Sequence, residues 1–222
     1  MQPQQQSKQT PARPAPLKPA APVRVESLAP EAPAEILTPR LRLRPLVEAD
    51  RAEFCALHDR NRTHLEAFLP LGAEDQSSDS IFSRQLELTT AGDTTGKAFR
   101  RIAVDLETDQ LIGAFNLVVV RRGLEWDADT SCWLAADHTG RGIASEGLAA
   151  LLSYSFADLP EGLGLHAIQG FIAPENRASQ RLAASFGFEK QDDGATHMTV
   201  GDRWQLHEKW TLSIANWQKL AS

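Results

Sequence analysis

The stretch HTGRGIASEGLAALL, residues 138–152, places three small residues, Gly140, Gly142 and Ala144, at the start of a run with helical spacing. Glycine permits left-handed backbone angles and lets a ligand approach the backbone closely. The unpaired N–H groups at a helix start attract an anion. The stretch therefore predicts a turn that cradles a diphosphate. The alternative interpretation is a tight strand-to-helix turn without a ligand.

The spacing disfavours three other common sites. The dinucleotide fingerprint needs a third glycine and a later acidic residue, and neither stands at the required place. A P-loop ends in Gly-Lys-Ser/Thr, which GRGIAS lacks. The six histidines are scattered, and none lies in a nucleophile elbow, so no Ser-His-Asp triad is predicted.

Composition predicts one soluble domain. The chain has 222 residues, 42% of them hydrophobic, which is enough for one domain and a tail. We find neither the ~18 consecutive apolar residues of a membrane helix nor a secretory signal, so we predict a cytoplasmic protein with no membrane partner. The net charge of −6 disfavours nucleic acid as a partner. Cys55 and Cys132 are too few for a disulfide framework or a zinc site, and no metal is expected.

Residues 1–35 form a leader distinct from the domain at residues 36–222. The leader holds eight of the thirteen prolines and no aromatic residue, so it cannot bury enough apolar surface to fold. We predict a flexible, solvated tail. A transit peptide or a basic docking arm is the alternative, which the helix-breaking prolines disfavour. Residues 36–222 carry 19 basic and 26 acidic residues, a formal charge of −7, so the acidity belongs to the domain.

The elements that must position the turn follow from residue periodicity. Residues 36–47 alternate apolar and charged side chains, as a half-buried strand does. Asp50 and Glu53 have the spacing of a capping box, and apolar residues at helical intervals follow them. Residues 63–70 predict a second, short helix, and residues 81–89 predict a third.

The second half of the chain predicts strands around two helices. Residues 99–106 and 111–123 flank the turn residues ETDQ and predict an antiparallel hairpin. After a loop at 123–129, the predicted elements are a strand at 130–136, a helix at 143–157, a strand at 165–174, a helix at 175–187 and strands at 188–191, 194–200 and 203–217. This order predicts a layered α/β (α+β) fold with a mixed, mostly antiparallel sheet and a central strand-helix-strand unit.

The surroundings of the turn favour the diphosphate interpretation. WLAADHTGRGIASEGLAALLSYSF, followed by FIAPENRASQRLAASFGFEK, resembles the GNAT superfamily of acetyl-CoA-dependent N-acetyltransferases over nearly all of residues 36–222. LTPRLRLRPL, NRTHLEAFLP, Asn176 with Ser179, FGFEK and GDRWQLHEKWTL are similar to the RimJ/RimL-type ribosomal-protein alanine N-acetyltransferases. The resemblance implies a GNAT-type sheet with helices on both faces and acetyl-CoA as co-substrate.

The resemblance also implies which residues hold acetyl-CoA. In that superfamily the pyrophosphate lies on backbone N–H groups of an Arg/Gln-x-x-Gly-x-Gly/Ala turn, matched here by Thr139, Gly142 and Ala144. Thr139 departs from the family's Arg or Gln, and we expect backbone donors, the helix dipole and Arg141 to supply the attraction. The preceding strand would offer its edge to the pantetheine arm, which Asn176 would also bind. The implied cofactor-binding residues are Cys132, Trp133, Leu134, Thr139, Gly140, Arg141, Gly142, Ile143, Ala144, Ser145, Asn176 and Ser179.

Acetylation of an amine requires a neutral amine, a polarised thioester carbonyl and a proton for the leaving thiolate. Asp129 is the candidate base, with Asp127 and Asp137 as competitors and a solvated loop acid as the alternative for each. The N–H of Leu134 or its neighbour is the candidate for polarising the carbonyl. Ser179 resembles the serine near the sulfur in this branch, although helix capping is an alternative role. Alignment of the two substrates can supply much of the rate.

Three further side chains lie near the expected site. His138, beside the turn, could contact a phosphate, but an exposed turn histidine without a specific role is the simpler interpretation. Trp126 and Phe68 are expected to border the acceptor site. The other tryptophans are interpreted as packing residues.

The sequence thus predicts an N-acetyltransferase for a primary amine, with the N-terminal α-amino group of a protein as its acceptor. The acidic domain would attract a basic chain such as the end of a ribosomal protein. Two alternatives stay open: an acetyltransferase for a polyamine, aminoglycoside or amino-acid conjugate, and a regulatory protein that binds acetyl-CoA without turnover. A monomer or a homodimer is expected.

Overall fold

The computed structural model describes residues 35–67, 77–200 and 203–221. The predicted leader, apart from Glu35, and Phe68 lie outside these residues. The described strands are β1 (Ile36–Leu37), β2 (Leu41–Arg44), β3 (Phe99–Asp105), β4 (Leu111–Arg121), β5 (Asp127–Leu134), β6 (Ala167–Ile172), β7 (Glu189–Lys190), β8 (Thr196–Val200) and β9 (Arg203–Ser213). The described α-helices are α1 (Arg51–Glu66), α2 (Ser78–Thr95), α3 (Ile143–Phe156), α4 (Arg177–Ser185) and α5 (Ile214–Ala221).

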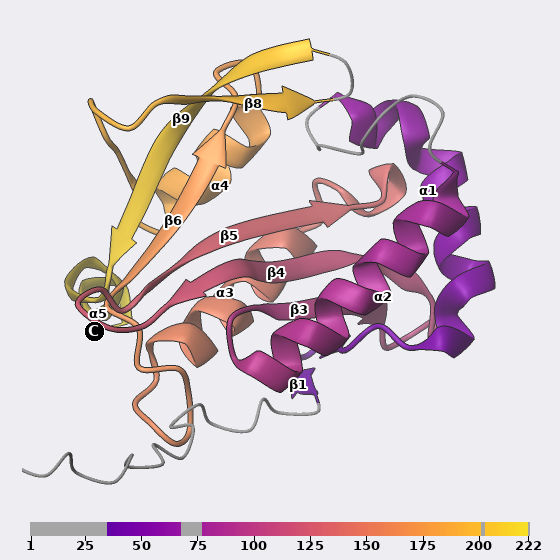
Figure 1. The fold of residues 1–222 in the computed structure, drawn as a ribbon, viewed down its shortest axis with the longest axis horizontal. Helices are drawn as coiled ribbons and strands as arrows, with labels where there is room; N and C mark the ends of the chain where they lie inside the picture. Colours follow the sequence, from indigo (N-terminus) through magenta and orange to yellow (C-terminus); the bar gives the residue numbers. More distant parts are fainter. Residues whose placement is uncertain (1–34, 68–76, 201–202, 222) are drawn as a thin grey trace, which may run out of the picture.

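These strands form one mixed sheet in the order β1-β2-β3-β4-β5-β6-β9-β7, with β8 paired to β9 (Figure 1). Among the described strands, β5 and β6 are the one parallel pair, and the other neighbours are antiparallel. Helix α3 connects β5 to β6, because parallel neighbours need a crossover. The predicted α/β fold, with its mostly antiparallel sheet and central strand-helix-strand unit, is confirmed.

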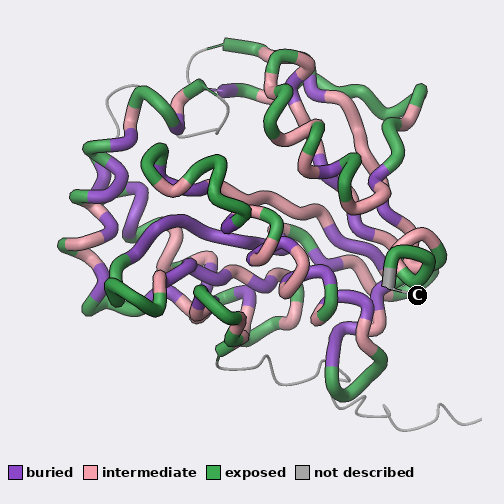
Figure 2. Tube along the Cα trace, turned by 180° about the vertical axis from the view of Figure 1, so that it is seen from behind, coloured by how far each residue is buried: buried purple, intermediate pink, exposed green. Residues whose placement is uncertain are grey.

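Helices cover both faces of the sheet, as predicted. Helices α1 and α2 lie on one face and α3 on the other (Figure 1). Apolar side chains of α3, with Ala183 of α4, form one core with the sheet, and those of α1 and α2 form a second core. Figure 2 shows buried residues following the central strands. Leu41 and Leu43 of β2 are fully buried while Arg42 and Arg44 are partly exposed, which confirms the predicted alternation.

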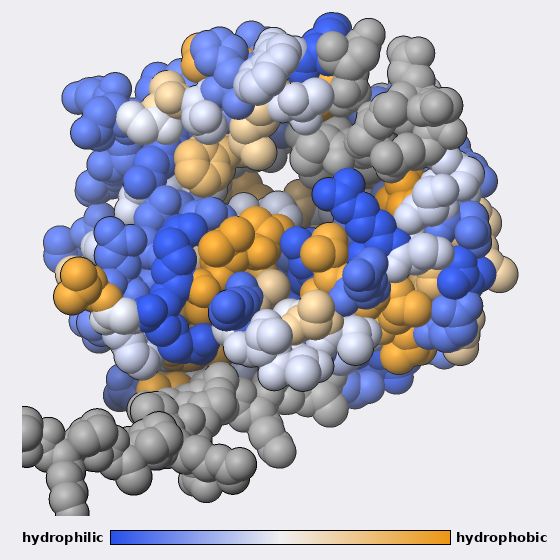
Figure 3. Space-filling model, viewed as in Figure 1, coloured by the Kyte–Doolittle hydropathy of each residue, from blue (hydrophilic) through white to orange (hydrophobic). Residues whose placement is uncertain are grey.

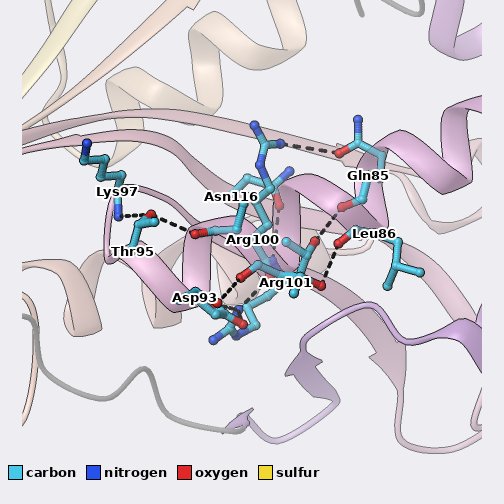
Figure 4. A network of polar contacts seen from close by, with 12 residues as sticks. Gln85, Leu86, Asp93, Thr95, Lys97, Arg100, Arg101 and Asn116 are labelled. Atoms are coloured by element: carbon cyan, nitrogen blue, oxygen red, sulfur yellow. Dashed lines mark hydrogen bonds and ion pairs between the residues drawn. The ribbon is translucent and has the colours of Figure 1, made fainter.

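A buried arginine ties the end of α2 to the start of β3 (Figure 4). The guanidinium of Arg101 donates to Asp93 Oδ1 (3.0 Å) and to the carbonyl of Arg100 (2.7 Å), and it lies 3.8 Å from the ring centre of Phe99. The backbone N–H of Arg101 donates to Asn116 Oδ1 on β4 (3.2 Å). These contacts hold the end of α2 against β3 and β4, because a buried charge must keep its partners.

The predicted capping box of Asp50 and Glu53 is wrong, because both carboxylates have other partners. Asp50 accepts hydrogen bonds from the N–H of Val47 (2.9 Å) and from Arg44 (2.7 Å), which closes a short 3-10 turn at Glu48–Asp50. Glu53 accepts a hydrogen bond from the N–H of Leu111 (2.7 Å), at the start of β4. Nearby partners of Asp50 and a distant partner of Glu53 thus take the place of the predicted cap.

Several predicted boundaries also differ from the structure. Helix α2 extends beyond the predicted residues 81–89 at both ends, and the strand predicted at 36–47 is divided into β1 and β2. Helix α1 continues without a break to Glu66, so residues 63–66 belong to it and not to a separate helix, and residues 68–70 lie outside the described part. Strand β5 already begins at Asp127, because Arg121 at the end of β4 still pairs with it. Strand β9 ends at Ser213, whose Oγ accepts from the N–H of Asn216 (3.2 Å) and so begins α5 where a strand had been predicted.

His58 of α1 is a buried histidine in the second core. Its ring stacks on Phe54 (4.3 Å between ring centres) and meets the edge of Trp133 on β5 (4.9 Å). Its Nε2 is buried, with no hydrogen-bond partner among the described residues. Burial lowers the pKa of His58 to about 4, so the ring is neutral at pH 7.

We expect His58 to make the fold sensitive to acid. The unfolded histidine takes up a proton near pH 6.5 and the folded one near pH 4. Between these values the unfolded state binds more protons, so the free energy of unfolding decreases as the pH is lowered. The free energy of unfolding should lose about 1.4 kcal/mol per pH unit in this window through His58 alone. Urea unfolding of H58L from pH 7 to pH 4.5 should show a slope smaller by that amount. H64L, at an exposed position of the same helix, is the control, and equal slopes for the two variants would refute the expectation.

None of the described helices is long and apolar enough to cross a membrane.

Candidate active site

The predicted anion turn joins β5 to α3. A 3-10 turn at Ala136–His138 is followed by Gly140 and Gly142, whose φ angles are +72° and +75°. Gly142 is the N-cap of the 14-residue helix α3, and no side chain of the described residues caps the first helical turn there. The N–H groups at the start of α3 and the positive end of the helix dipole are therefore available to an anion, whereas the N–H groups of His138 and Thr139 already donate to the carbonyls of Ala135 and Ala136.

The backbone angles, and not crowding, explain the two glycines. A Cβ atom at Gly140 would meet no other atom within 4 Å, and one at Gly142 would lie 3.6 Å from Nη2 of Arg40. Positive φ strains any other residue, so glycine is needed for the turn itself. The uncrowded approach is also what a ligand held by backbone N–H groups requires.

Helix α1 holds the entry to the turn. Oδ1 of Asn61 accepts a hydrogen bond from the N–H of Ala136 (2.9 Å), and its Nδ2 donates to the carbonyl of Leu57 (2.9 Å). The hydroxyl of Thr139 donates to the carbonyl of Ala136 (2.8 Å), so this side chain serves the turn's own geometry. Helical spacing indicated that Asn61 lies on the buried face, but nothing local pointed to a partner 75 residues away.

A carboxylate in the first turn of α3 ties the turn to the first strands. Glu146 accepts hydrogen bonds from Thr38 Oγ1 (2.6 Å), from the N–H of Arg40 (2.8 Å) and from Nε of Arg40 (2.7 Å). Burial raises the pKa of Glu146, but the hydrogen bonds from Thr38 and Arg40 outweigh this effect and keep the pKa below its usual value. Sequence reasoning missed Arg40, because its partner Glu146 lies 106 positions further along the chain.

Next to the turn, the sheet opens between its two parallel strands. The β5–β6 register runs from Asp127 opposite Ala167 to Thr130 opposite Gly170. Beyond these pairs the strands diverge (Figure 1), and Figure 3 shows this face of the molecule hollowed between β5 and β9, with apolar surface beside the hollow. Residues Ser131–Leu134 therefore keep a β5 edge without a β6 partner. Such an edge can bind an extended ligand as an added strand.

The start of α4 follows β6 on the other side of the opening. Asn176 is the N-cap of α4, and its Oδ1 accepts from the N–H of Ser179 (3.1 Å). The amide nitrogen of Asn176 stays available as a donor. The hydroxyl of Ser179 makes no hydrogen bond within the described residues, and the side chain is partly buried. The capping role considered for Ser179 thus belongs to Asn176.

The three candidate acids lie in different places. Asp127 and Asp129 both pair with Arg121, whose Nη2 lies 2.6 Å from Asp129 Oδ1, and these two acids raise the pKa of the arginine. Asp129 lies one residue pair before the strands diverge, opposite Gln169. Asp137 is exposed and accepts from His138 Nδ1 (2.8 Å). Within the described residues, no group of three or more potential ligands is placed to hold a metal ion.

The remaining candidates lie either in the core or just before the start of β5. Trp133 packs against the second core, beside His58. Cys132 packs against the first core, and burial raises the pKa of its thiol to about 11, as expected of an unreactive cysteine. Trp126 is partly exposed, between Arg122 (5.9 Å to the ring centre) and His166.

Comparison with known proteins identifies this arrangement. The family described as "Acetyltransferase (GNAT) domain" matches residues 40–189. The chain belongs to this GNAT acetyltransferase family. It is therefore an acyltransferase, as predicted, and the anion turn, the opened strand pair and the start of α4 lie inside the matched region.

Curated relatives and solved structures agree with the family. The chain is 26% identical over 176 residues to the probable N-acetyltransferase YjcK of Bacillus subtilis, covering 78% of this chain and 93% of the relative. It is 24% identical over 182 residues to the [ribosomal protein uS5]-alanine N-acetyltransferase of Escherichia coli, covering 82% and 92%. Mycobacterium smegmatis RimJ in complex with CoA-disulfide superposes with a TM-score of 0.69, at 24% identity, over 82% of this chain and 88% of that one. The predicted resemblance to the RimJ/RimL type is confirmed, and this last likeness supports the GNAT fold.

Proposed function

We propose that this GNAT enzyme transfers the acetyl group of acetyl-CoA to the N-terminal α-amino group of a protein. The observation that carries the proposal is the order of two features along the chain: the unpaired edge of β5 at Ser131–Leu134 is followed by the two-glycine turn at the start of α3. A diphosphate on the turn lets the pantetheine arm run along Ser131–Leu134 as an added strand. The thioester then reaches the point where the two parallel strands diverge.

The residues near this point suit the steps of the reaction. The amine nitrogen attacks the thioester carbon, a C–N bond forms, and the C–S bond breaks. The N–H of Leu134 polarises the carbonyl, since that of its neighbour Ala135 already donates to the carbonyl of Ile112 (2.8 Å). Ser179 gives a proton to the leaving thiolate and takes one back from the nitrogen of the tetrahedral intermediate, which becomes the amide nitrogen. Asp129 takes the proton of the incoming ammonium through a water molecule, because Arg121 already donates to both of its carboxylate oxygens.

A protein acceptor is favoured over a small amine by three observations. The Escherichia coli relative, by its name, acts on an alanine of ribosomal protein uS5. The hollow in Figure 3 opens to the surface, so the end of a chain can enter while the rest stays outside. The formal charge of −7 on residues 36–222 would attract a basic chain.

The test uses the full chain, acetyl-CoA and three acceptors analysed by mass spectrometry. The acceptors are a basic peptide with a free N-terminal alanine, the same peptide with a blocked N-terminus and an internal lysine, and spermidine. We expect one acetyl group on the free α-amine alone. Acetylated spermidine without acetylated peptide would make the chain a small-molecule enzyme. Acetyl-CoA binding without any product, also in an extract of its source, would favour the regulatory alternative.

A further inference from the structure

The guanidinium of Arg40 lies at the anion turn, although Arg40 precedes β2 and is distant from the turn in sequence. Its Nη1 donates to the carbonyl of Arg141 (3.0 Å), inside the turn. Its Nη2 lies 3.6 Å from the position that a Cβ atom of Gly142 would occupy. No hydrogen bond of Nη2 is found within the described residues. One edge of the guanidinium thus lies beside the N-cap of α3.

The other edge of the guanidinium is held in place by Glu146. Nε of Arg40 lies 2.7 Å from Oε2 of Glu146, whose side chain is 15% exposed and also accepts from Thr38. The Arg40 side chain is 48% exposed, so it is anchored yet reachable from solvent. A fixed, accessible guanidinium can bind a phosphate without first losing much side-chain freedom.

The position of this charge is unfavourable without a ligand. A helix N-terminus carries a partial positive charge, so a cation placed there is repelled, by roughly the 0.3–1 kcal/mol with which an anion would be attracted. Glu146 opposes that repulsion, and an anion bound over the turn would add a second opposite charge beside Arg40. The repulsion therefore indicates that the turn and Arg40 together serve an anion.

Arg40 also supplies what the turn itself lacks. The family pattern begins with Arg or Gln, and Thr139 at this position uses its hydroxyl within the turn. Arg141 carries a charge, but its side chain is exposed and has no hydrogen bond or ion pair within the described residues. Of the two arginines at the turn, Arg40 is the one whose side chain is oriented by contacts within the described residues.

We propose that Arg40 is a ligand of the acetyl-CoA diphosphate and donates from Nη2 to an oxygen that also lies on the N–H groups after Gly142. This inference rests on the proposed function, because it takes acetyl-CoA as the ligand. It assigns to a residue before the second strand the role that the family pattern gives to the first position of the turn.

The test measures the affinity of the full chain for acetyl-CoA and for 3′-dephospho-CoA by isothermal titration. R40Q should weaken both ligands by roughly 10- to 30-fold, the loss typical of one charge-assisted phosphate contact. R42Q removes an arginine of β2, two residues after Arg40, that pairs with Asp109, and it should leave both affinities unchanged. R40K breaks the same fork on Glu146 but keeps the charge, so it should lose less than R40Q.

Each other outcome has a distinct meaning. Equal losses in R40K and R40Q would make Arg40 a structural tie to Glu146 and overturn the proposal, as would unchanged affinity in R40Q. A loss for acetyl-CoA but not for 3′-dephospho-CoA would assign Arg40 to the 3′-phosphate and overturn the diphosphate contact. If the unaltered chain binds neither compound, the proposed function itself fails.

Discussion

G142V is expected to weaken acetyl-CoA binding by at least roughly 100-fold, the loss of about 3 kcal/mol of binding free energy. Gly142 has φ of +75°, and its N–H begins the row of donors at the start of α3. A branched side chain would fill the approach over those donors and press toward Arg40 Nη2, 3.6 Å from the Cβ position. The same change should also lower the free energy of unfolding by about 1–2 kcal/mol, because valine is strained at positive φ. Titration calorimetry and urea unfolding measure the two effects separately.

G164V separates strain from loss of the site. Gly164 also has positive φ, +60°, but lies in the loop between α3 and β6, away from the turn. A Cβ atom there would have 3.5 Å to Leu159, so the variant should lose similar stability while keeping its affinity. Should G142V bind acetyl-CoA as well as G164V does, the diphosphate does not lie on this turn.

S179A should slow turnover by roughly 100-fold while acetyl-CoA affinity and stability stay near those of the unaltered enzyme. The hydroxyl of Ser179 has no hydrogen bond within the described residues, so its removal leaves no donor or acceptor unpaired there. Helix α4 keeps its cap, because Asn176 accepts from the backbone N–H of Ser179 and not from its side chain. The loss should therefore appear in kcat alone, measured as release of free thiol at saturating acetyl-CoA.

S185A is the matched control on the same helix. Its hydroxyl donates to the carbonyl of Leu182 (2.7 Å) at an exposed position, and turnover should not change. If S179A retains the full rate on an accepted substrate, Ser179 does not protonate the thiolate. If it loses acetyl-CoA affinity in proportion to rate, the hydroxyl binds the cofactor and has no separate role in the chemical step.

Features that depend on nearby residues were predictable from the sequence. The alternation of Leu41 and Leu43 with arginines marked β2, and the small residues before an apolar run marked the turn and α3. Each of these signals arises from one face of one element, so periodicity reports it directly. The family resemblance then supplied the GNAT-type sheet with helices on both of its faces.

Contacts between distant segments were not predictable. The ties of Arg40 to Glu146 and of Asn61 to Ala136 span 106 and 75 residues, and neither pair has a local spacing that points to the other. The same cause defeated the capping box, because Glu53 bonds Leu111 on β4. The end of β9 was predicted wrongly for a different reason. Ile214 and Trp217 are apolar residues that suit a strand and a helix alike, and the hydrogen bond from the N–H of Asn216 to the Ser213 hydroxyl favours the helix.

The divergence of β5 and β6 should allow the two halves of the sheet to move relative to each other. Within the described residues, backbone pairing between the β1–β5 half and the β6–β9 half is confined to residues 126–130 and 166–170. Beyond this short paired segment no hydrogen-bonded ladder of β5 with β6 stiffens the sheet. We therefore expect the two halves to twist against each other about the paired segment. A ligand that lies along Ser131–Leu134 and contacts both halves would restrict this motion. Amide hydrogen exchange of β5 and β6 should then slow on both sides when acetyl-CoA is bound, and the loaded enzyme should resist unfolding as a single unit.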